Sequence, residues 1–170
     1  MINIVLFEPE IPQNTGNIMR CCAGTGAKLH LIEPLGFIVD EAHLRRSCVN
    51  YWQYVDYKIY KNFDEFLSQN KGVMVFLTRY GYKRPDEIDM SDPSKDYYLI
   101  LGKESTGIPK EILKDHLDMC VRYPMNDHIR ALNLANTACM ILYECLRQQG
   151  YPGLSLYEPE TLKGKDFLKK

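Results

Sequence analysis

Short apolar runs alternate with helix-like amphipathic segments along almost the whole chain. Six runs, rich in branched and aromatic residues, predict strands over residues 3–7, 28–32, 55–60, 73–78, 97–101 and 119–123. Because most of these runs are not interrupted by polar residues, we expect burial on both faces of the strands. The pattern therefore predicts an α/β fold, with a mostly parallel six-stranded sheet and helices on both faces.

Helix start and stop signals occupy the segments between the predicted strands. Asn14 or Thr15 is expected to cap a helix that runs to about residue 24, and Pro109 to start one that runs to residue 116. Further helices are predicted over 40–48, 63–69 and 132–149. Since no repeat or linker interrupts the alternation, we expect one domain over 1–153 and a polar, Lys-rich tail over 154–170.

The composition is that of a soluble globular protein. The chain has 170 residues, of which 45% are hydrophobic and 25% charged. Glu8 and Pro9 end the apolar start of the chain, which therefore predicts a strand and not a signal peptide. Because no apolar run is long enough to cross a bilayer, we expect a cytoplasmic protein without a membrane partner.

The six cysteines, at 21, 22, 48, 120, 139 and 145, form no CxxC pair. A zinc site is therefore not expected, and we predict no metal. Cys139 and Cys145 fall in an apolar helical pattern, where cysteine behaves as a small hydrophobic residue. A disulfide framework is not expected in a chain without a secretion signal.

The formal net charge of −1 argues against a protein that coats nucleic acid without specificity. Local basic clusters still leave room for an RNA enzyme: Arg45 with Arg46; Arg79 with Lys83 and Arg84; and Lys163, Lys165, Lys169 and Lys170. Each cluster, taken singly, is more simply explained as solvated surface charge.

Two segments with candidate chemistry each join a predicted strand to a helix. In the first, residues 9–20, Asn14, Gly16 and Arg20 form the pattern N-x-G-x-x-x-R. In the second, residues 99–109, Gly102 and Gly107 bound a loop whose backbone groups would reach a cofactor directly at the end of a parallel strand. Without further context, a capped helix and an ordinary strand-to-helix turn explain these segments as well.

A third such segment joins the last predicted strand to the long final helix. It combines R-Y-P-M at 122–125 with R-A-L-N-L-A-N at 130–136. Asn133 and Asn136 are spaced to share one helix face, and a buried Asn on a helix requires hydrogen-bond partners. The simpler explanation is that both side chains tie down neighbouring loops.

In order and spacing, the three segments together resemble the signature motifs of the SPOUT methyltransferases. The strings P-E-I-P-x-N-T-G-N-I-x-R, G-x-E-x-x-G-I-P and R-x-L-N-L-x-N are similar to one small, single-domain branch, which 2'-O-methylates the wobble nucleotide of tRNA. The resemblance runs from about residue 2 to residue 153. Ala131 and Ala135 stand where the family usually has Ser, so any role of a hydroxyl at these positions is absent here.

The resemblance implies a C-terminal deep trefoil knot, a homodimer, and S-adenosylmethionine as cofactor without a metal. It places cofactor contacts at Leu77, Gly102, Tyr123 and Ala131, beside Gly107 of the glycine-bounded loop. The implied substrate is the tRNA anticodon loop, with cytidine or a modified uridine as target. Single-stranded loops suit this reading because their unstacked bases can be reached.

Catalysis on an already activated methyl group depends mainly on alignment and on removal of the hydroxyl proton. Arginine keeps its proton in proteins, so we expect Arg20 to hold a phosphate or the developing 2'-oxyanion. Asn14, Glu104, Arg130 and Asn133 are expected to shape the loops or to orient the ribose. Tyr143 is a further candidate, although a place in the helix core explains it equally well.

Alternatives from other classes remain open at this stage. A nucleotide-binding oxidoreductase would need G-x-G-x-x-G with an acidic residue about twenty positions later, and this fingerprint is missing. A non-catalytic RNA-binding module would need no cofactor, so binding of S-adenosylmethionine separates it from the enzyme. Methylation of another tRNA ribose would use the same residues.

Overall fold

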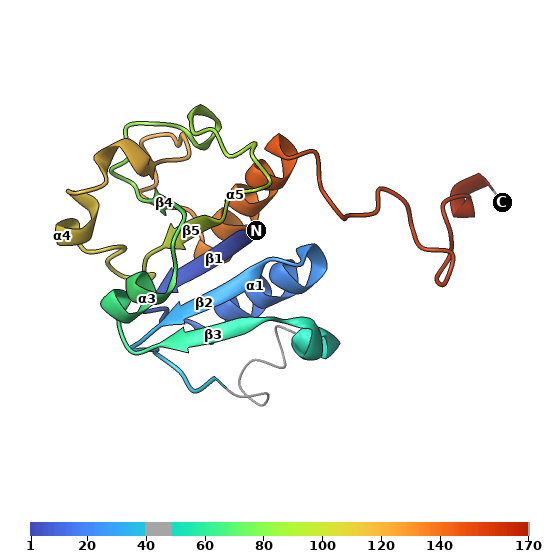
Figure 1. The fold of residues 1–170 in the computed structure, drawn as a ribbon, viewed down its shortest axis with the longest axis horizontal. Helices are drawn as coiled ribbons and strands as arrows, with labels where there is room; N and C mark the ends of the chain where they lie inside the picture. Colours follow the sequence, from blue (N-terminus) through green and yellow to red (C-terminus); the bar gives the residue numbers. More distant parts are fainter. Residues whose placement is uncertain (40–48, 170) are drawn as a thin grey trace.

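A six-stranded, all-parallel sheet forms the centre of the computed structural model, which describes residues 1–39 and 49–169. The strand order is β3-β2-β1-β5-β4-β6, with β1 near the middle (Figure 1). This confirms the predicted α/β class. The strands are β1 (Ile2–Phe7), β2 (Lys28–Ile32), β3 (Tyr57–Tyr60), β4 (Val73–Leu77), β5 (Tyr97–Leu101) and β6 (Cys120–Val121).

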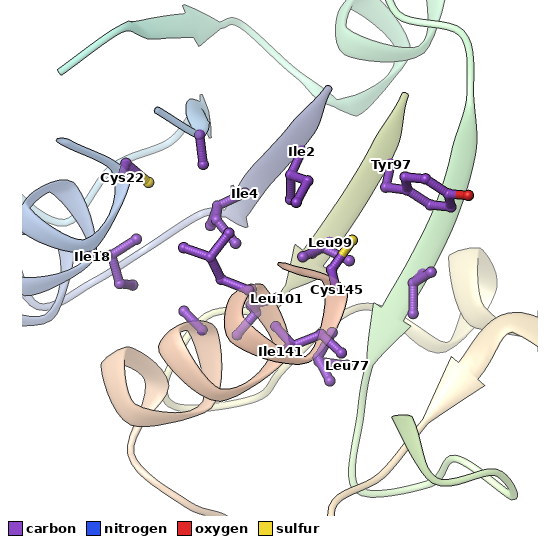
Figure 2. Packing of buried hydrophobic residues seen from close by; sticks show 14 of the residues in the cluster. Ile2, Ile4, Ile18, Cys22, Leu77, Tyr97, Leu99, Leu101, Ile141 and Cys145 are labelled. Carbon is purple, nitrogen blue, oxygen red and sulfur yellow. The ribbon is translucent and has the colours of Figure 1, made fainter. Parts of the chain in front are cut away.

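Alternate residues of each strand enter two different cores. On β1, Ile2, Ile4 and Leu6 join the core that contains residues of α1 (Pro12–Thr25) and α5 (Leu134–Gln148). Val5 and Phe7 join the core beside α3 (Phe63–Gln69) and α4 (Lys110–Leu113). Helices therefore cover both faces, as the unbroken apolar strands predicted. Figure 2 shows the first of these cores.

The start of α1 differs from the prediction. The helix begins at Pro12, whose fixed φ suits the first turn, and the residue that precedes it, Ile11, makes no side-chain cap. Asn14 and Thr15 lie inside the helix with buried side chains, so neither is the cap. The side chain of Asn14 is instead bonded to a residue far away in the sequence, as described below.

Strands β3 and β6 and helix α4 are among the elements that are shorter than predicted. Strand β3 begins at Tyr57, because Val49–Tyr54 form a 3₁₀ helix. Helix α4 ends at Leu113, whose carbonyl accepts a hydrogen bond from His116 N, 2.9 Å away. Strand β6 has two residues, because Met119 belongs to a 3₁₀ turn and Arg122 N donates to the Lys83 carbonyl. The helix predicted over 40–48 lies outside the described residues.

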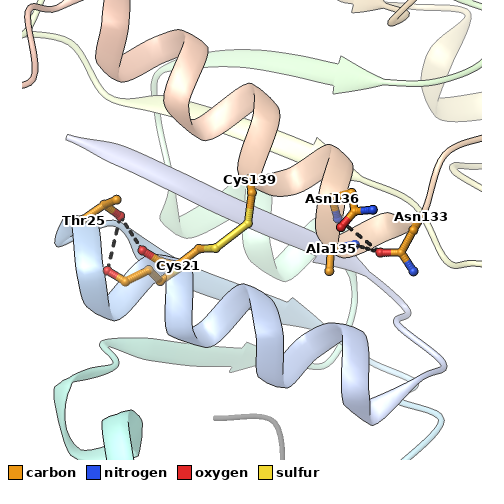
Figure 3. Close-up of a disulfide and its surroundings, with 7 residues drawn as sticks. Cys21, Thr25, Asn133, Ala135, Asn136 and Cys139 are labelled. Carbon is orange, nitrogen blue, oxygen red and sulfur yellow. Dashed lines mark hydrogen bonds between the residues drawn. A yellow bond between two sulfur atoms is a disulfide. The ribbon is translucent and has the colours of Figure 1, made fainter. Parts of the chain in front are cut away.

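A disulfide joins the two helices of the first core. Cys21 of α1 and Cys139 of α5 are 118 residues apart in sequence, but their Cα atoms lie 6.5 Å apart (Figure 3). That separation is within the range that a disulfide can span. The sequence analysis expected no disulfide framework and did not predict this single pair, because the packing of two distant helices decides which sulfurs meet.

The last residues extend away from the sheet and its helices (Figure 1). Local turns hold this tail, such as the hydrogen bond from Leu162 N to the Pro159 carbonyl, and a 3₁₀ turn spans Phe167–Lys169. Leu156, Leu162 and Leu168 are exposed there. Apolar residues on the tail thus remain uncovered in a single copy of the chain.

Candidate active site

Loops at the carboxyl ends of three strands surround a cavity of about 470 Å³. Segments 77–80 at the end of β4, 101–108 at the end of β5 and 121–123 at the end of β6 line it, together with Met125, residues 131–134 at the start of α5, and Thr137. Ile11 and Asn14 of the α1 segment complete the wall. Ligands of parallel-sheet enzymes bind at this edge. All three candidate segments of the sequence therefore contribute to one site.

A chain of hydrogen bonds links these segments through Glu104, Asn14 and Asn133, here called the Glu104 network. The Glu104 carboxylate accepts hydrogen bonds from Glu10 N at 2.8 Å, Ile11 N at 3.3 Å and Asn14 Nδ2 at 2.9 Å. Asn14 Oδ1 in turn accepts from Asn133 Nδ2 at 3.1 Å. Bonds to a charged acceptor are the strong ones, so this carboxylate fixes the start of α1 against the glycine-bounded loop.

Asn133 also forms the N-terminal cap of α5. Its Oδ1 accepts hydrogen bonds from Ala135 N at 2.9 Å and Asn136 N at 3.2 Å (Figure 3). The prediction that Asn133 and Asn136 share a face within the helix is corrected, because Asn133 precedes the first helical residue. One amide thus stabilises the helix through its oxygen and joins the Glu104 network through its nitrogen.

Two further contacts hold the 102–107 loop against the residues after β1. Lys103 Nζ donates to Glu8 Oε2 at 2.6 Å, and this bond raises the pKa of Lys103. Ser105 donates to the Glu10 carboxylate through both N and Oγ at 2.8 Å, which lowers the pKa of Glu10. These charges are only partly buried, so their stabilisation is small and depends on salt.

The two glycines of this loop have different requirements. A Cβ on Gly102 would lie 2.2 Å from the backbone of Gly107 and Ile108, so the close approach of the two loop ends excludes any other residue. Gly107 has φ +76° with open space around it, and its requirement is conformational. Both residues line the cavity.

Eight of the ten predicted site residues line this cavity. They are Asn14, Leu77, Gly102, Glu104, Gly107, Tyr123, Ala131 and Asn133. Arg20 and Arg130 do not, and both are exposed. Arg20 lies in the second half of α1, and its guanidinium is 5.1 Å from the centre of the Tyr51 ring. Tyr143 lines a neighbouring cavity of about 400 Å³, which shares Tyr123 with the first.

Two lining residues carry buried polar atoms without a hydrogen-bond partner in the described chain, Arg122 Nε and Tyr123 Oη. Burial raises the pKa of the Tyr123 phenol, and the charge of Glu144 adds to this effect. A buried donor without a partner is costly, so these atoms suit a polar ligand.

Arg122, Thr78 and Arg79 all line the cavity, but the sequence analysis did not select them as site residues. Their position at the end of a predicted strand or directly after it was the available signal, because ligand contacts gather at strand ends.

Within the described residues, no three His, Cys, Asp or Glu side chains are grouped so that they could hold a metal ion. No helix in the same part of the chain is long and apolar enough to span a membrane.

Comparison with known proteins agrees with this arrangement. The family model of the SpoU rRNA methylases matches residues 1–143. The chain belongs to this family. A relative from Yersinia pestis, named tRNA (cytidine(34)-2'-O)-methyltransferase, is 43% identical over 166 residues, 93% of this chain and 100% of the relative.

Two solved structures extend the comparison from sequence to fold. A crystal structure from Bacillus anthracis is 47% identical with a TM-score of 0.88, covering 92% of this chain and 99% of that one. A structure that addresses 2'-hydroxyl methylation of cytidine or uridine 34 on tRNA is 35% identical with a TM-score of 0.81, covering 88% and 97%. The SpoU fold thus spans nearly all of this chain.

Proposed function

We propose that this chain transfers a methyl group to the ribose 2'-hydroxyl of the wobble nucleotide, position 34, of tRNA. The Yersinia pestis relative that carries the name of this activity aligns with 93% of the chain. The observation that carries the proposal is the Glu104 network, which joins the three candidate segments around one cavity. A non-catalytic RNA-binding module would have no need for such an arrangement.

S-adenosylmethionine is the proposed cofactor, and the cavity suits it in size and chemistry. Its volume of about 470 Å³ falls in the range of small-molecule sites. The walls combine apolar Leu77 and Ile108 with the backbone of the glycine-bounded loop. The unpartnered Arg122 Nε and Tyr123 Oη add polar groups for a ligand. When bound, the cofactor supplies an activated methyl group on a sulfonium.

The protein's own contribution is positioning. Glu104 is the one carboxylate among the described lining residues, which include no histidine. Because its oxygens accept three N–H groups, Glu104 holds loops in place and is a poor candidate for the general base. We propose that alignment of hydroxyl, methyl and sulfonium supplies most of the rate enhancement, and that the hydroxyl proton leaves to solvent.

Arg20 and Arg130 are proposed to act at the substrate side. Both are exposed and neither lines the cavity of its own chain. In the proposed homodimer, α1 and α5 pack across a two-fold axis. Arg20 of one copy would then reach the site of the other copy and hold a phosphate or the developing 2'-oxyanion.

We further propose that residues 1–153 form the catalytic domain, that its loops close a trefoil knot, and that the protein is cytoplasmic. The knot is supported by the close contact between segments 78–84 and 120–122, where Gly81 packs directly on the Val121 backbone and Lys83 pairs with Val121. A Cβ on Gly81 would lie 2.5 Å from the Val121 carbonyl carbon. An experimental structure in which the chain does not thread these loops would contradict the knot.

The function is tested by incubating the protein with labelled S-adenosylmethionine and total tRNA, followed by nuclease digestion and mass spectrometry. We expect a 2'-O-methyl group at position 34 that is lost with Arg20→Ala and retained with Arg84→Ala. Arg84 is a suitable control because its guanidinium is paired with Asp86 outside the cavity. Label on a base or on another ribose would contradict the substrate, and no label would contradict the enzyme.

A mixed dimer tests whether Arg20 acts in the partner's site. One subunit carries Arg20→Ala and the other Glu104→Gln, each of which should inactivate its own homodimer. If Arg20 acts across the interface, the mixed dimer contains one intact site and recovers about half of the wild-type activity per dimer. No recovery would place Arg20 in its own subunit's site, and a monomer by light scattering would contradict the dimer.

A further inference from the structure

Two exposed aromatic side chains lie in a loop that forms part of the rim of the cavity. In the loop after β4, residues 78–82, the side chain of Tyr80 is 63% exposed and that of Tyr82 is 87% exposed. Tyr80 lines the cavity together with Thr78 and Arg79. An aromatic ring can bury 150–250 Å², so leaving two in solvent forgoes much stabilisation. Neighbouring exposed rings are typical of a binding surface.

The backbone that carries these rings is held in place. Thr78 N donates to the Val121 carbonyl at 3.0 Å, and Arg122 N donates to the Lys83 carbonyl at 2.8 Å. Gly81 packs on the Val121 backbone, so a side chain there would force the loop away from β6. Since both ends and the middle of the loop are fixed, the two rings are displayed in advance of binding, which lowers the entropy cost of association.

The charges around the loop favour an anionic partner. The Arg79 guanidinium lies over the Tyr80 ring, 4.7 Å from its centre, and has no carboxylate within ion-pair distance in the described chain. The nearest acidic residues along the sequence, Asp86 and Glu87, are bonded to Arg84. Arg84 is therefore neutralised, and Lys83 donates to the Asp118 carbonyl. Of the predicted basic cluster, Arg79 is the member left for a phosphate.

We propose that residues 78–82 form a nucleobase-stacking platform, with Tyr80 and Tyr82 stacking on unpaired bases and Arg79 holding the adjacent phosphate. This inference rests on the proposed function and names how the RNA is held. A ribose that enters the cavity brings its neighbouring nucleotides over this rim. Stacking on aromatic and guanidinium planes is the usual way in which proteins bind unstacked bases. Because every base has a stacking face, the platform contributes to the affinity for RNA and fixes the position of the RNA, but it does not select a particular base.

The test compares Tyr80→Ala and Tyr82→Ala with Tyr80→Phe and Tyr82→Phe, using a tRNA anticodon stem-loop and its fully paired duplex as probes. Tyr157→Ala is the matched control, because that tyrosine is 68% exposed on the tail, outside both cavities. Filter binding gives the Kd for RNA, and calorimetry gives the Kd for S-adenosylmethionine. Light scattering reports the oligomeric state.

Each Ala substitution should weaken stem-loop binding about tenfold, while the Phe variants and the control stay within about twofold. Duplex binding should not change in any variant. The Kd for S-adenosylmethionine should not change with Tyr82→Ala, because Tyr82 is not among the residues that line the cavity. Stem-loop binding within twofold of wild type in both Ala variants would overturn the proposal. A parallel loss of cofactor binding would instead assign the loop to the cavity wall, and a shift to monomers would assign it to a contact between copies. If the wild type binds the stem-loop but transfers no methyl group, the proposed function fails while the platform is still tested.

Discussion

Each face of the sheet has a buried polar side chain with hydrogen-bond partners, His30 on one face and Asn14 on the other, but the two arrangements differ. On the α3–α4 face, His30 bonds to Tyr60 Oη at 2.8 Å and to Asn3 Oδ1 at 3.1 Å, and aromatic rings surround the group. Beside α1 and α5, the Glu104 network spans the strand ends and borders a cavity. The first arrangement satisfies its polar atoms internally, whereas the second leaves room for a ligand. Burial of polar groups therefore marks a site here only in combination with open volume.

The largest effect expected from this contrast concerns the α1–α5 face, which carries the disulfide. Reduction of Cys21–Cys139 should lower the free energy of unfolding by about 4 kcal/mol, because the bond closes a loop of more than a hundred residues. Guanidinium unfolding with and without reductant measures this. Cys120→Ala, in the core of the other face, should respond to reductant like the wild type, and Cys139→Ala should not respond. An equal midpoint for the wild type under both conditions would contradict a stabilising disulfide.

Glu104→Gln should have the next largest effect. The amide has one oxygen where the carboxylate has two, and its NH₂ group would face N–H donors. We expect kcat/KM for methyl transfer to fall about a hundredfold, which corresponds to about 2.7 kcal/mol. Glu10→Gln is the matched control, because Glu10 is bonded to Ser105 of the same loop but lies outside the cavity lining. An equal loss of kcat/KM in both variants would show that the Glu104 network contributes no more to methyl transfer than the contact between Glu10 and Ser105 does.

On the α3–α4 face we expect a dependence on pH. Burial, assisted by the nearby charge of Lys28, lowers the pKa of His30 from 6.5 to about 4. Between these two pKa values the unfolded chain therefore binds more protons than the folded chain. The contribution of neutral His30 to the free energy of unfolding is complete above the unfolded pKa and is lost as the pH falls toward 4.

Between about pH 7.5 and pH 5 the free energy of unfolding should drop by about 2 kcal/mol on account of His30. Urea unfolding at both pH values measures the drop. His30→Gln, which can still bond to Asn3 and Tyr60, should reduce it. A drop of the same size in this variant would assign the pH dependence to other groups.

The smallest effect separates the two roles of Asn133. Asn133→Ser keeps an oxygen to cap α5 but removes the N–H group that reaches Asn14, whereas Asn133→Ala removes both. The Ala variant should lose about 1 kcal/mol of stability and the Ser variant less than half of that. Both should lose methyl transfer to a similar degree. If methyl transfer instead falls in proportion to the loss of stability in the two variants, the helix cap is the role of Asn133 on which activity depends.

The sequence predicts regular elements well where local signals agree. The bounds of β2, β5 and α3 match their predictions, because each is an apolar or amphipathic stretch bounded by polar residues and α3 has a capping Asn62. Asn14 shows the opposite case, since its local pattern predicts a cap while its partner Glu104 is 90 residues away. The Cys21–Cys139 pair and the cavity residues Arg79 and Arg122 depend on the same kind of long-range packing. Such contacts follow from strand order, which no local window contains.

The hydrogen bond between Asn14 and Asn133 also has a consequence for protein synthesis. Its partners are 119 residues apart, and the wall of the cavity extends to Thr137. Strands β1 to β5 can pair early on the ribosome, since folding during translation proceeds from the N-terminal side. The cavity cannot close until α5 has emerged. A prematurely terminated product that ends before residue 122 would therefore keep much of the sheet but lack the part of the cavity wall between residues 122 and 137, and would not compete with the finished enzyme for cofactor.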